Sequence, residues 1–154
     1  MEGGSAAGGH EIAQLNLARL KEPLDSPLMQ PFVDRLDEIN GLAEQSPGFR
    51  WRLQGEYGNA TDIRIADDPL VLINMTVWAT IDDLYTFTYR SEHKTVFARR
   101  FEWAERWNGP NNVLWWQATG TIPTVGDGLH RLDLLCENGP GPEAFTFKQR
   151  FPAP

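Results

Sequence analysis

The chain has 154 residues, 41% of them hydrophobic and 23% charged, which is typical of one globular domain with its own core. Its net charge of −7 argues against nucleic-acid binding, because phosphate recognition requires clustered Lys and Arg. No apolar run approaches the roughly 20 residues that cross a bilayer, so no membrane partner is expected. The single cysteine, Cys136, excludes an internal disulfide framework and indicates a reducing compartment, which favours a cytoplasmic protein.

The start of the chain divides into a leader and a first strand. Residues 1–10 are small, polar and glycine-rich, which predicts a flexible leader, and residues 11–150 are predicted to form the single domain. Residues 11–20 alternate in polarity, so we expect a half-buried strand. Leu15 and Leu17 would lie on one face of this strand, and the other face would carry Gln14, Asn16 and Ala18.

A helix is predicted from Ser26 to Gln45. Ser26 is a possible cap and Pro27 fits the first turn, while Pro31 either marks the true start of the helix or kinks its first turn. Apolar residues recur at helical spacing through the segment, namely Phe32, Leu36, Ile39 and Ala43.

Two strands with a long connection follow this helix. The first is predicted over residues 49–54, the connection over 55–69 and the second strand over 70–78. The second strand has the strongest alternation in the chain, with Val71, Ile73, Met75 and Val77 on one face and Leu72, Asn74, Thr76 and Trp78 on the other.

Two helical segments are predicted next. Thr80 and Asp83 form a capping signature for a helix whose inner stripe is Ile81, Leu84, Tyr85 and Thr88. A second helix is predicted over residues 92–107, and Asn108-Gly-Pro would end it.

The last part of the chain predicts a strand, a helix and a short strand. Residues 113–119 form the strand, in which Trp115 and Trp116 must point to opposite faces; which of them faces a cavity stays open. Residues 123–137 form the helix, with Leu129, Leu132 and Cys136 on one stripe, so that Cys136 is expected in the core. Residues 144–148 form the short strand.

This order of elements predicts an α+β domain of the ferredoxin-like βαββαβ type, with an antiparallel sheet and helices on one face. The other face would then be polar and aromatic, carrying Gln14, Asn16, Arg50, Arg52, Asn74, Thr76, Trp78 and one of the adjacent tryptophans. Two such faces packed together would enclose a mixed cavity, and we therefore expect a homodimer.

Several strings in the sequence resemble one protein family. They are Gln14-Leu-Asn-Leu-Ala, Val71-Leu-Ile-Asn-Met-Thr-Val-Trp, Tyr89-Arg-Ser-Glu-His, Arg99-Arg-Phe-Glu-Trp, Val113-Leu-Trp-Trp and Pro123-Thr-Val. Together they resemble an uncharacterised family of microbial domains of unknown function, number 3291, within the dimeric α/β-barrel superfamily and related to antibiotic-biosynthesis monooxygenases. The resemblance spans residues 10–147 and implies a dimeric α/β barrel.

His93 and Arg100 are the first candidates for chemistry. On a helix they share a face, where a histidine of near-neutral pKa exchanges protons and an arginine holds an oxyanion or carboxylate. The structural alternative is that His93 only forms local hydrogen bonds where two helices meet.

The strand faces supply the remaining candidates. Asn74 could polarise a carbonyl or stabilise an enolate-like anion, and Trp78 would contact a substrate; the alternative is that both are packing residues. Further candidates for substrate contact are Gln14, Asn16, Thr76, Tyr89, Trp103 and Trp116. The sequence contains no glycine-rich phosphate loop, no nucleophile elbow and no Cys/His spacing of a metal site.

Three classes of function remain open. The first is a cofactor-independent enzyme that acts on a hydrophobic, oxygenated small molecule by oxygenation, isomerisation, dehydration or cyclisation, and the resemblance implies a place in secondary metabolism. The second is a haem enzyme or haem carrier with His93 as axial ligand, because some barrels of the superfamily bind haem. The third is a non-catalytic ligand-binding dimer. The mixed aromatic and polar face favours the first class.

Overall fold

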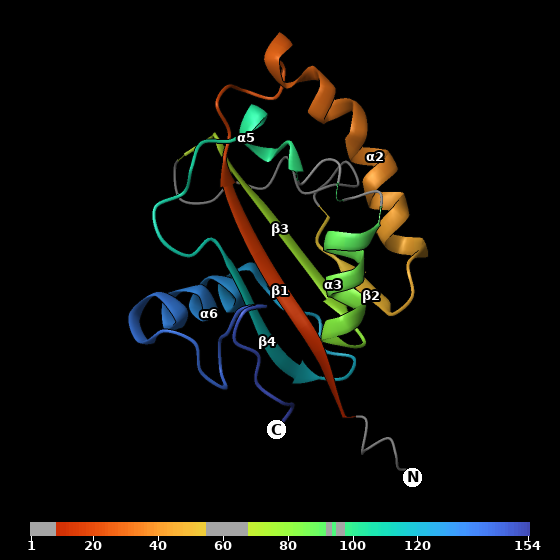
Figure 1. Ribbon diagram of the computed structural model, residues 1–154, viewed down its shortest axis with the longest axis vertical. Helices are drawn as coiled ribbons and strands as arrows, with labels where there is room; N and C mark the ends of the chain where they lie inside the picture. Colours follow the sequence, from red (N-terminus) through yellow and green to blue (C-terminus); the bar gives the residue numbers. More distant parts are fainter. Residues whose placement is uncertain (1–8, 55–67, 92–93, 95–97) are drawn as a thin grey trace.

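The computed structural model describes residues 9–54, 68–91, 94 and 98–154. Within them, one antiparallel sheet has the strand order β2-β3-β1-β4 (Figure 1). Its strands are β1 (His10–Arg19), β2 (Phe49–Arg52), β3 (Val71–Trp78) and β4 (Asn112–Ala118). With β1 and β3 in the centre, this is the strand order of a ferredoxin-like βαββαβ domain, and the predicted fold class is confirmed.

Helices cover both faces of the sheet, not one face as expected. They are the 3-10 turn η1 (Pro27–Met29) and the helices α2 (Gln30–Gln45), α3 (Ile81–Arg90), α5 (Arg100–Trp103) and α6 (Val125–Asn138). The first four lie against one face, and α6 lies against the opposite face (Figure 1). Among the described residues, no helix combines the length and the apolar character needed to cross a membrane.

Side-chain caps define where two of the helices begin. The Thr80 hydroxyl accepts the Asp83 backbone N–H at 3.1 Å at the start of α3, as its sequence predicts. At the start of α6, Thr124 and Asp127 exchange hydrogen bonds of 3.0 and 2.9 Å in a capping box. The helix α2 has no side-chain cap, and Pro31 lies in its first turn, where a missing N–H costs no hydrogen bond.

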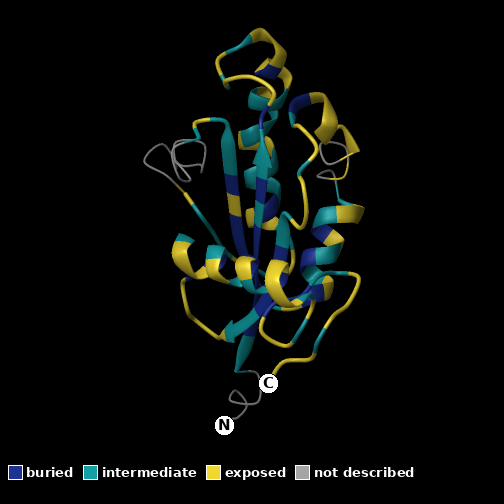
Figure 2. Ribbon diagram, turned by 90° about the vertical axis from the view of Figure 1, so that its left-hand side faces the viewer, coloured by how far each residue is buried: buried dark blue, intermediate teal, exposed yellow. Residues whose placement is uncertain are grey.

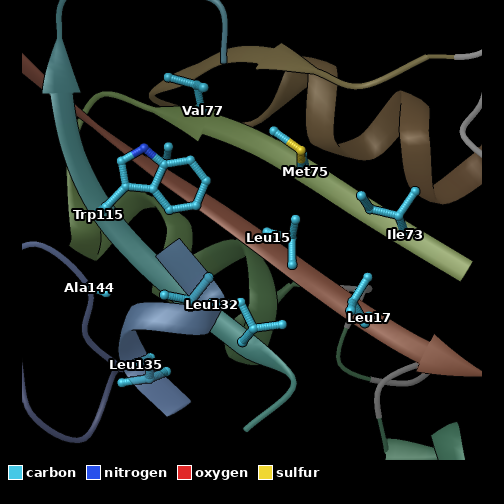
Figure 3. Packing of buried hydrophobic residues seen from close by; sticks show 11 residues of the cluster. Leu15, Leu17, Ile73, Met75, Val77, Trp115, Leu132, Leu135 and Ala144 are labelled. Atoms are coloured by element: carbon cyan, nitrogen blue, oxygen red, sulfur yellow. The ribbon is translucent and has the colours of Figure 1, made fainter. Parts of the chain in front are cut away.

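The larger apolar core lies between the sheet and α6 (Figure 3). The α6 helix approaches the sheet closely at Gly128, where a Cβ atom would lie 2.6 Å from Cδ1 of Leu15. The strand residues that face α6 are buried, as the alternation in β1 and β3 predicts, while the outer side of α6 is exposed (Figure 2). The cluster comprises Ala13, Leu15, Leu17, Ile73, Met75, Val77, Val113, Trp115, Leu132, Leu135 and Ala144.

A second core lies on the opposite face, under α2 and α3. Trp78 is fully buried there and packs against Phe49 and Phe87, with ring centroids 5.5 and 5.1 Å away. The C-terminal segment closes this core, because Phe145 forms a backbone bridge to Leu114 in β4. The pairing is limited to isolated bridges at Ala144 and Phe145 and bends follow, so the strand predicted over residues 144–148 is not formed.

The helix predicted over residues 92–107 ends earlier than predicted. Residues 92–93 and 95–97 lie outside the described residues, and α5 ends at Trp103. The chain turns extended there because its backbone pairs with the end of β1: the Lys21 N–H donates to the Trp103 carbonyl and the Glu105 N–H to the Arg19 carbonyl, both at 2.8 Å.

Two predicted helix stripes are shifted. The buried residues of α3 are Ile81, Leu84 and Phe87, so Phe87 takes the inner position assigned to Tyr85 and Thr88. In α6 the buried residues are Gly128, Leu132 and Leu135, and Cys136 is exposed and is not a core residue.

The polar sheet face does not meet a partner's sheet as expected. Gln14, Asn16, Asn74 and Thr76 lie beneath α2, α3 and α5 of the same chain, where they line a cavity. Arg50 does not share this face, because the register shift between Phe49 and Trp51 lets it pair with Glu11 at 2.9 Å on the other side. The mixed cavity therefore exists within one chain, and the homodimer stays a prediction.

Candidate ligand-binding pocket

A cavity of about 540 Å³ separates the polar part of the sheet from α2, α3 and α5. This volume is in the range of pockets that hold small organic ligands. Its floor consists of residues with amide and hydroxyl side chains, mostly in strands, and its walls are mostly aromatic and aliphatic. The polar floor residues are Gln14, Asn16, Asn74, Thr76, Asn111 and Asn112.

Three asparagines form a row across the floor. Asn16 in the central strand β1 lies opposite Asn74 of β3 and opposite Asn112 of β4. Directly opposite residues of antiparallel strands have neighbouring side chains, so the register itself gathers these amides. The neighbouring β1 residue on this face, Gln14, lies opposite Thr76.

One hydrogen-bonded chain links the floor residues. The Asn112 Nδ2 donates to Gln14 Oε1 at 2.9 Å. The Gln14 Nε2 donates to Asn74 Oδ1 at 2.7 Å and to Thr76 Oγ1 at 2.9 Å. The Thr76 Oγ1 also accepts the indole N–H of Trp78 at 2.8 Å.

The direction of this hydrogen-bond chain is fixed by two groups, one that can only accept a hydrogen bond and one that can only donate. At one end, Asn112 Nδ2 also contacts the Leu15 carbonyl at 3.2 Å, and a carbonyl oxygen only accepts. At the other end, the Trp78 indole only donates. The intervening amide orientations follow from these ends and do not depend on assigning O and N by shape.

The direction of the hydrogen-bond chain decides which donors and acceptors of the floor are left for a ligand. The Asn74 oxygen is occupied, and its NH₂ group makes no hydrogen bond within the described residues. The Thr76 oxygen accepts twice, so its hydrogen remains available. Asn112 uses both amide hydrogens and has its oxygen left. The β3 side of the floor is therefore a patch of donors.

Asn16, in the centre of the row, has an unusual environment. Its Oδ1 is enclosed and has no hydrogen-bond partner among the described residues, while the residue lines the cavity. Leaving a buried acceptor unpaired costs about 1–3 kcal/mol.

The walls of the cavity are apolar. The helix α2 contributes the stripe that its periodicity predicts, and it therefore faces the cavity. The rings of Phe32 and Trp103 pack together, with centroids 5.5 Å apart, where α2 meets α5. The apolar wall residues include Phe32, Leu36, Ile39, Ala43, Leu84, Phe87, Trp103 and Phe147.

Aromatic and cationic residues surround the mouth of the cavity. Tyr89 and Phe101 line it and are 37% and 39% exposed. Burial, together with the neighbouring Tyr85, raises the pKa of Tyr89, so its phenol is a neutral hydrogen-bond donor at physiological pH. The guanidinium groups of Arg100 and Arg106 lie over the Phe101 ring, 4.6 and 4.4 Å from its centroid.

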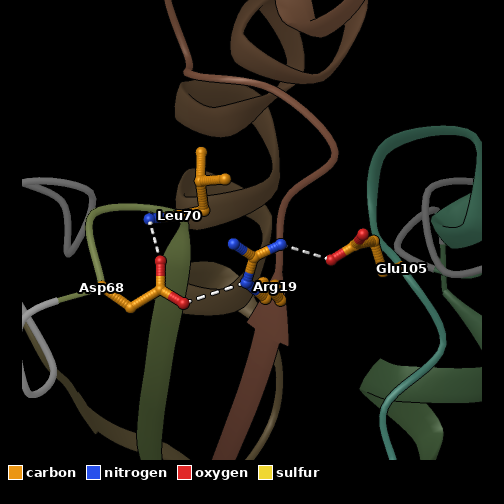
Figure 4. Close-up of polar contacts among 4 residues, drawn as sticks. All are labelled: Arg19, Asp68, Leu70 and Glu105. Atoms are coloured by element: carbon orange, nitrogen blue, oxygen red, sulfur yellow. Dashed lines mark hydrogen bonds and ion pairs between the residues drawn. The ribbon is translucent and has the colours of Figure 1, made fainter.

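An ion-pair cluster lies at the end of β1 beside the cavity (Figure 4). Arg19 contacts Asp68 at 2.9 Å and Glu105 at 2.5 Å. The Leu70 backbone N–H, followed by Arg19, lowers the pKa of Asp68, and the hydrogen bonds to the two carboxylates raise the pKa of Arg19. Glu105 lines the cavity and shares the single cation Arg19 with Asp68.

The structure brings most of the predicted site residues together. Seven line the cavity: Gln14, Asn16, Asn74, Thr76, Tyr89, Arg100 and Trp103. Trp78 and Trp116 are on the same sheet face but do not line it. Trp78 lies next to the floor along β3 and donates to Thr76, and the Trp116 indole donates to the Phe151 carbonyl at 2.8 Å. His93 lies outside the described residues, so its role and the haem alternative stay predictions.

Some cavity residues were not among the predicted ones. Asn112 completes the amide row, but only the β1–β4 register reveals it. Phe101 is carried by α5 itself, and Arg106 lines the cavity because the chain turns extended after α5. Phe147 does so because the C-terminal segment pairs with β4 at Phe145. Among the residues that the structure describes, no group of three or more His, Cys, Asp or Glu side chains could hold a metal ion.

Fold and cavity together define a ferredoxin-like α+β domain with an internal ligand-sized pocket. The chain belongs to the family described as Domain of unknown function (DUF3291), whose model matches residues 11–154, and the predicted family is confirmed. No curated protein sequence matches the chain.

Three solved structures are similar to most of the chain. NE2512, a protein of unknown function from Nitrosomonas europaea, is 9% identical with a TM-score of 0.47, over 76% of this chain and 96% of that one. A putative antibiotic biosynthesis monooxygenase from Nitrosomonas europaea is 17% identical with a TM-score of 0.45, over 74% and 92%. SnoaB, a cofactor-independent oxygenase from Streptomyces nogalater, is 12% identical with a TM-score of 0.45, over 75% and 96%.

Proposed function

We propose that the cavity binds a hydrophobic small molecule bearing carbonyl or hydroxyl oxygens, and that the protein acts on it as a cofactor-independent enzyme. The directed hydrogen-bond chain of the floor is the observation that carries this proposal. It leaves the Asn74 amide and the Thr76 hydroxyl as donors at the base of an apolar cavity. An acceptor oxygen on a hydrophobic ligand is the group that fits them.

The same donors suit a reaction through an oxyanion. Oxygenation, isomerisation, dehydration and cyclisation of a ketone or phenol all pass readily through an enolate or phenolate, whose oxygen gains negative charge. Preorganised donors stabilise that charge, and losing one costs about a hundredfold to a thousandfold in rate. Asn74 is the proposed anion-stabilising group.

Further roles are proposed for the other predicted residues. Arg100 at the mouth would hold a second oxygen, and His93 is proposed as the acid or base that moves the proton. Tyr89 and Trp103 would contact the hydrophobic body of the ligand, because both line the cavity. Gln14 and Asn16 would hold the side chains of the other floor residues in place.

We also propose a homodimer, formed through a different surface from the polar face. On the α6 side of the sheet, apolar residues flank the core and are only partly buried, among them Trp51 and Val71. A partner subunit that covers them would remove this apolar area from water.

Binding of two matched probes tests the proposed function. The ketone 2-acetonaphthone should bind more tightly than 2-ethylnaphthalene, which has a similar shape and no oxygen. Asn74→Asp replaces the donor by an acceptor of equal size and still accepts from Gln14, so it should weaken ketone binding about tenfold. Calorimetric titration measures both.

Asn40→Asp is the control, because Asn40 lines the same cavity from α2 and the substitution adds the same charge. If both variants weaken ketone binding equally, or if Asn74→Asp binds the ketone as the parent chain does, the donor patch does not recognise the ligand. Equal affinity for the two probes would lead to the same conclusion.

A further inference from the structure

The hydrogen-bond chain of the cavity floor has two different ends. It begins at Asn112, which donates to Gln14, and it continues from Gln14 to Asn74 and Thr76. A directed row of amides leaves an oxygen where it begins and N–H groups where it finishes, because each link uses one hydrogen and one acceptor. The floor is therefore polarised, with an acceptor on β4 and donors on β3.

Asn112 supplies the acceptor end of this floor. Its Nδ2 donates to Gln14 and to the Leu15 carbonyl, so both amide hydrogens are used. Its Oδ1 makes no hydrogen bond within the described residues. The enclosed side-chain atoms there that lack a partner are Asn16 Oδ1 and Ser26 Oγ, so the Asn112 oxygen is not enclosed. It is therefore an accessible acceptor on a residue that lines the cavity.

The two ends of the floor lie on opposite sides of the central strand β1 (Figure 1). Asn74 in β3 and Asn112 in β4 are both directly opposite Asn16. Neighbouring strands are about 4.8 Å apart, so the backbones of Asn74 and Asn112 are separated by roughly 10 Å. Gln14, on β1, offers no donor between them, because both of its amide hydrogens are used. A ligand that binds to both ends must therefore carry its two polar groups well apart.

We propose that the ligand of this cavity is a hydrophobic hydroxyketone. Its carbonyl oxygen accepts from the Asn74 amide and the Thr76 hydroxyl on β3, and its hydroxyl group donates to Asn112 Oδ1 on β4. This inference rests on the proposed function. It narrows the ligand class from molecules with an acceptor oxygen to molecules with an acceptor and a donor at opposite ends of an apolar body, which would contact the apolar walls of the cavity.

Three probes that differ at a single ring position test this ligand class. They are 6-acetyl-2-naphthol, its methyl ether and 2-acetonaphthone, which share the ketone and carry a hydroxyl donor, an ether oxygen or no second group. Calorimetric titration at about pH 6 keeps the phenol neutral. One added hydrogen bond, to the Asn112 oxygen, should make the naphthol bind about tenfold more tightly than either of the other two probes.

Asn112→Ala should reduce this preference to about one while 2-acetonaphthone still binds. Gln117→Ala should keep the preference and is the matched control. Gln117 is also in β4, donates its side-chain amide to a backbone carbonyl, that of Thr121 at 2.6 Å, and does not line the cavity. The preference is a ratio of affinities within each variant, so a general loss of affinity cancels, and the melting temperature verifies that each variant folds.

Equal affinity of the naphthol and its methyl ether in the parent chain would overturn the hydroxyketone, and this comparison depends on no variant. A preference that survives Asn112→Ala, or that is lost equally in Gln117→Ala, would also overturn it. In these cases, a 2-acetonaphthone that binds and is weakened by Asn74→Asp leaves the proposed function intact. If none of the three probes binds the parent chain, the proposed function fails together with the inference.

Discussion

Replacing Gly128 with alanine tests how closely α6 packs on the sheet. The added Cβ would lie 2.6 Å from Cδ1 and 3.3 Å from Cβ of Leu15, and 3.3 Å from the sulfur of Met75. Leu15 and Met75 are completely buried, so neither side chain has free space to move into. Gly126, in the same helix, is the matched site, because its nearest neighbour would be the Thr124 Oγ1 at 3.7 Å.

Two opposing effects set the magnitude. Alanine favours a helix over glycine by about 1 kcal/mol, and both variants gain part of this. An extra methyl group in a packed core costs about 1–3 kcal/mol, and only Gly128→Ala incurs it. The Gly128→Ala variant should therefore be less stable than Gly126→Ala by about 1–3 kcal/mol in the free energy of unfolding.

Urea denaturation and thermal melting measure this difference, which should lower the melting temperature by about 2–4 °C for each kcal/mol. Leu15→Val removes the atom that the new Cβ would approach most closely. The double variant should therefore lose less free energy of unfolding than the two single variants lose together. If Gly128→Ala equals or exceeds Gly126→Ala in stability, the described contact between α6 and β1 is wrong.

Three further predictions concern the floor, acid stability and assembly. Thr76→Val leaves the buried Trp78 indole N–H without an acceptor and should cost about 1–3 kcal/mol in thermal unfolding, whereas Thr76→Ser should cost much less; equal losses would contradict the hydrogen-bond chain. The Leu70 N–H and Arg19 lower the pKa of Asp68 below its ordinary 3.8, so the Asp68 carboxylate stabilises the fold above pH 3.8 and this stabilisation is lost as the pH falls through the lowered pKa. In a pH series of denaturation experiments, Asp68→Asn should therefore lose less stability in acid than the parent chain. An unchanged pH dependence would refute this prediction. Light scattering should give twice 17.4 kDa, and a strictly monomeric species would refute the homodimer.

Much of the fold follows from local patterns in the sequence. The alternation in β1 and β3 assigns their faces correctly, because side chains of a strand alternate with a period of two. The buried face of α6 differs from the predicted stripe because α6 packs closely on the sheet at Gly128. A glycine has no apolar side chain, so the hydrophobic periodicity of the sequence does not mark this position. The end of α5 depends on pairing with β1, which lies far away in the sequence.

The cavity is less accessible to sequence reasoning. The polar residues of β1 and β3 are visible as an alternating set, but both faces of this sheet are covered, so the sequence does not decide what covers the polar one. Asn112 joins the floor through strand register, and Arg106 reaches the mouth through a turn that ends a helix early. The direction of the hydrogen-bond chain requires the positions of the Leu15 carbonyl and the Trp78 indole.

The carbonyl stretching frequency of bound 2-acetonaphthone tests the central claim most directly. An isotope label on the carbonyl separates its band from those of the protein, and hydrogen bonds to a ketone lower this frequency. If the Asn74 amide and the Thr76 hydroxyl hold the oxygen, the band of the bound ketone should lie below its position in a hydrocarbon solvent and should move back toward that position in Asn74→Asp. A bound ketone that absorbs at the hydrocarbon frequency in the parent chain would contradict the account.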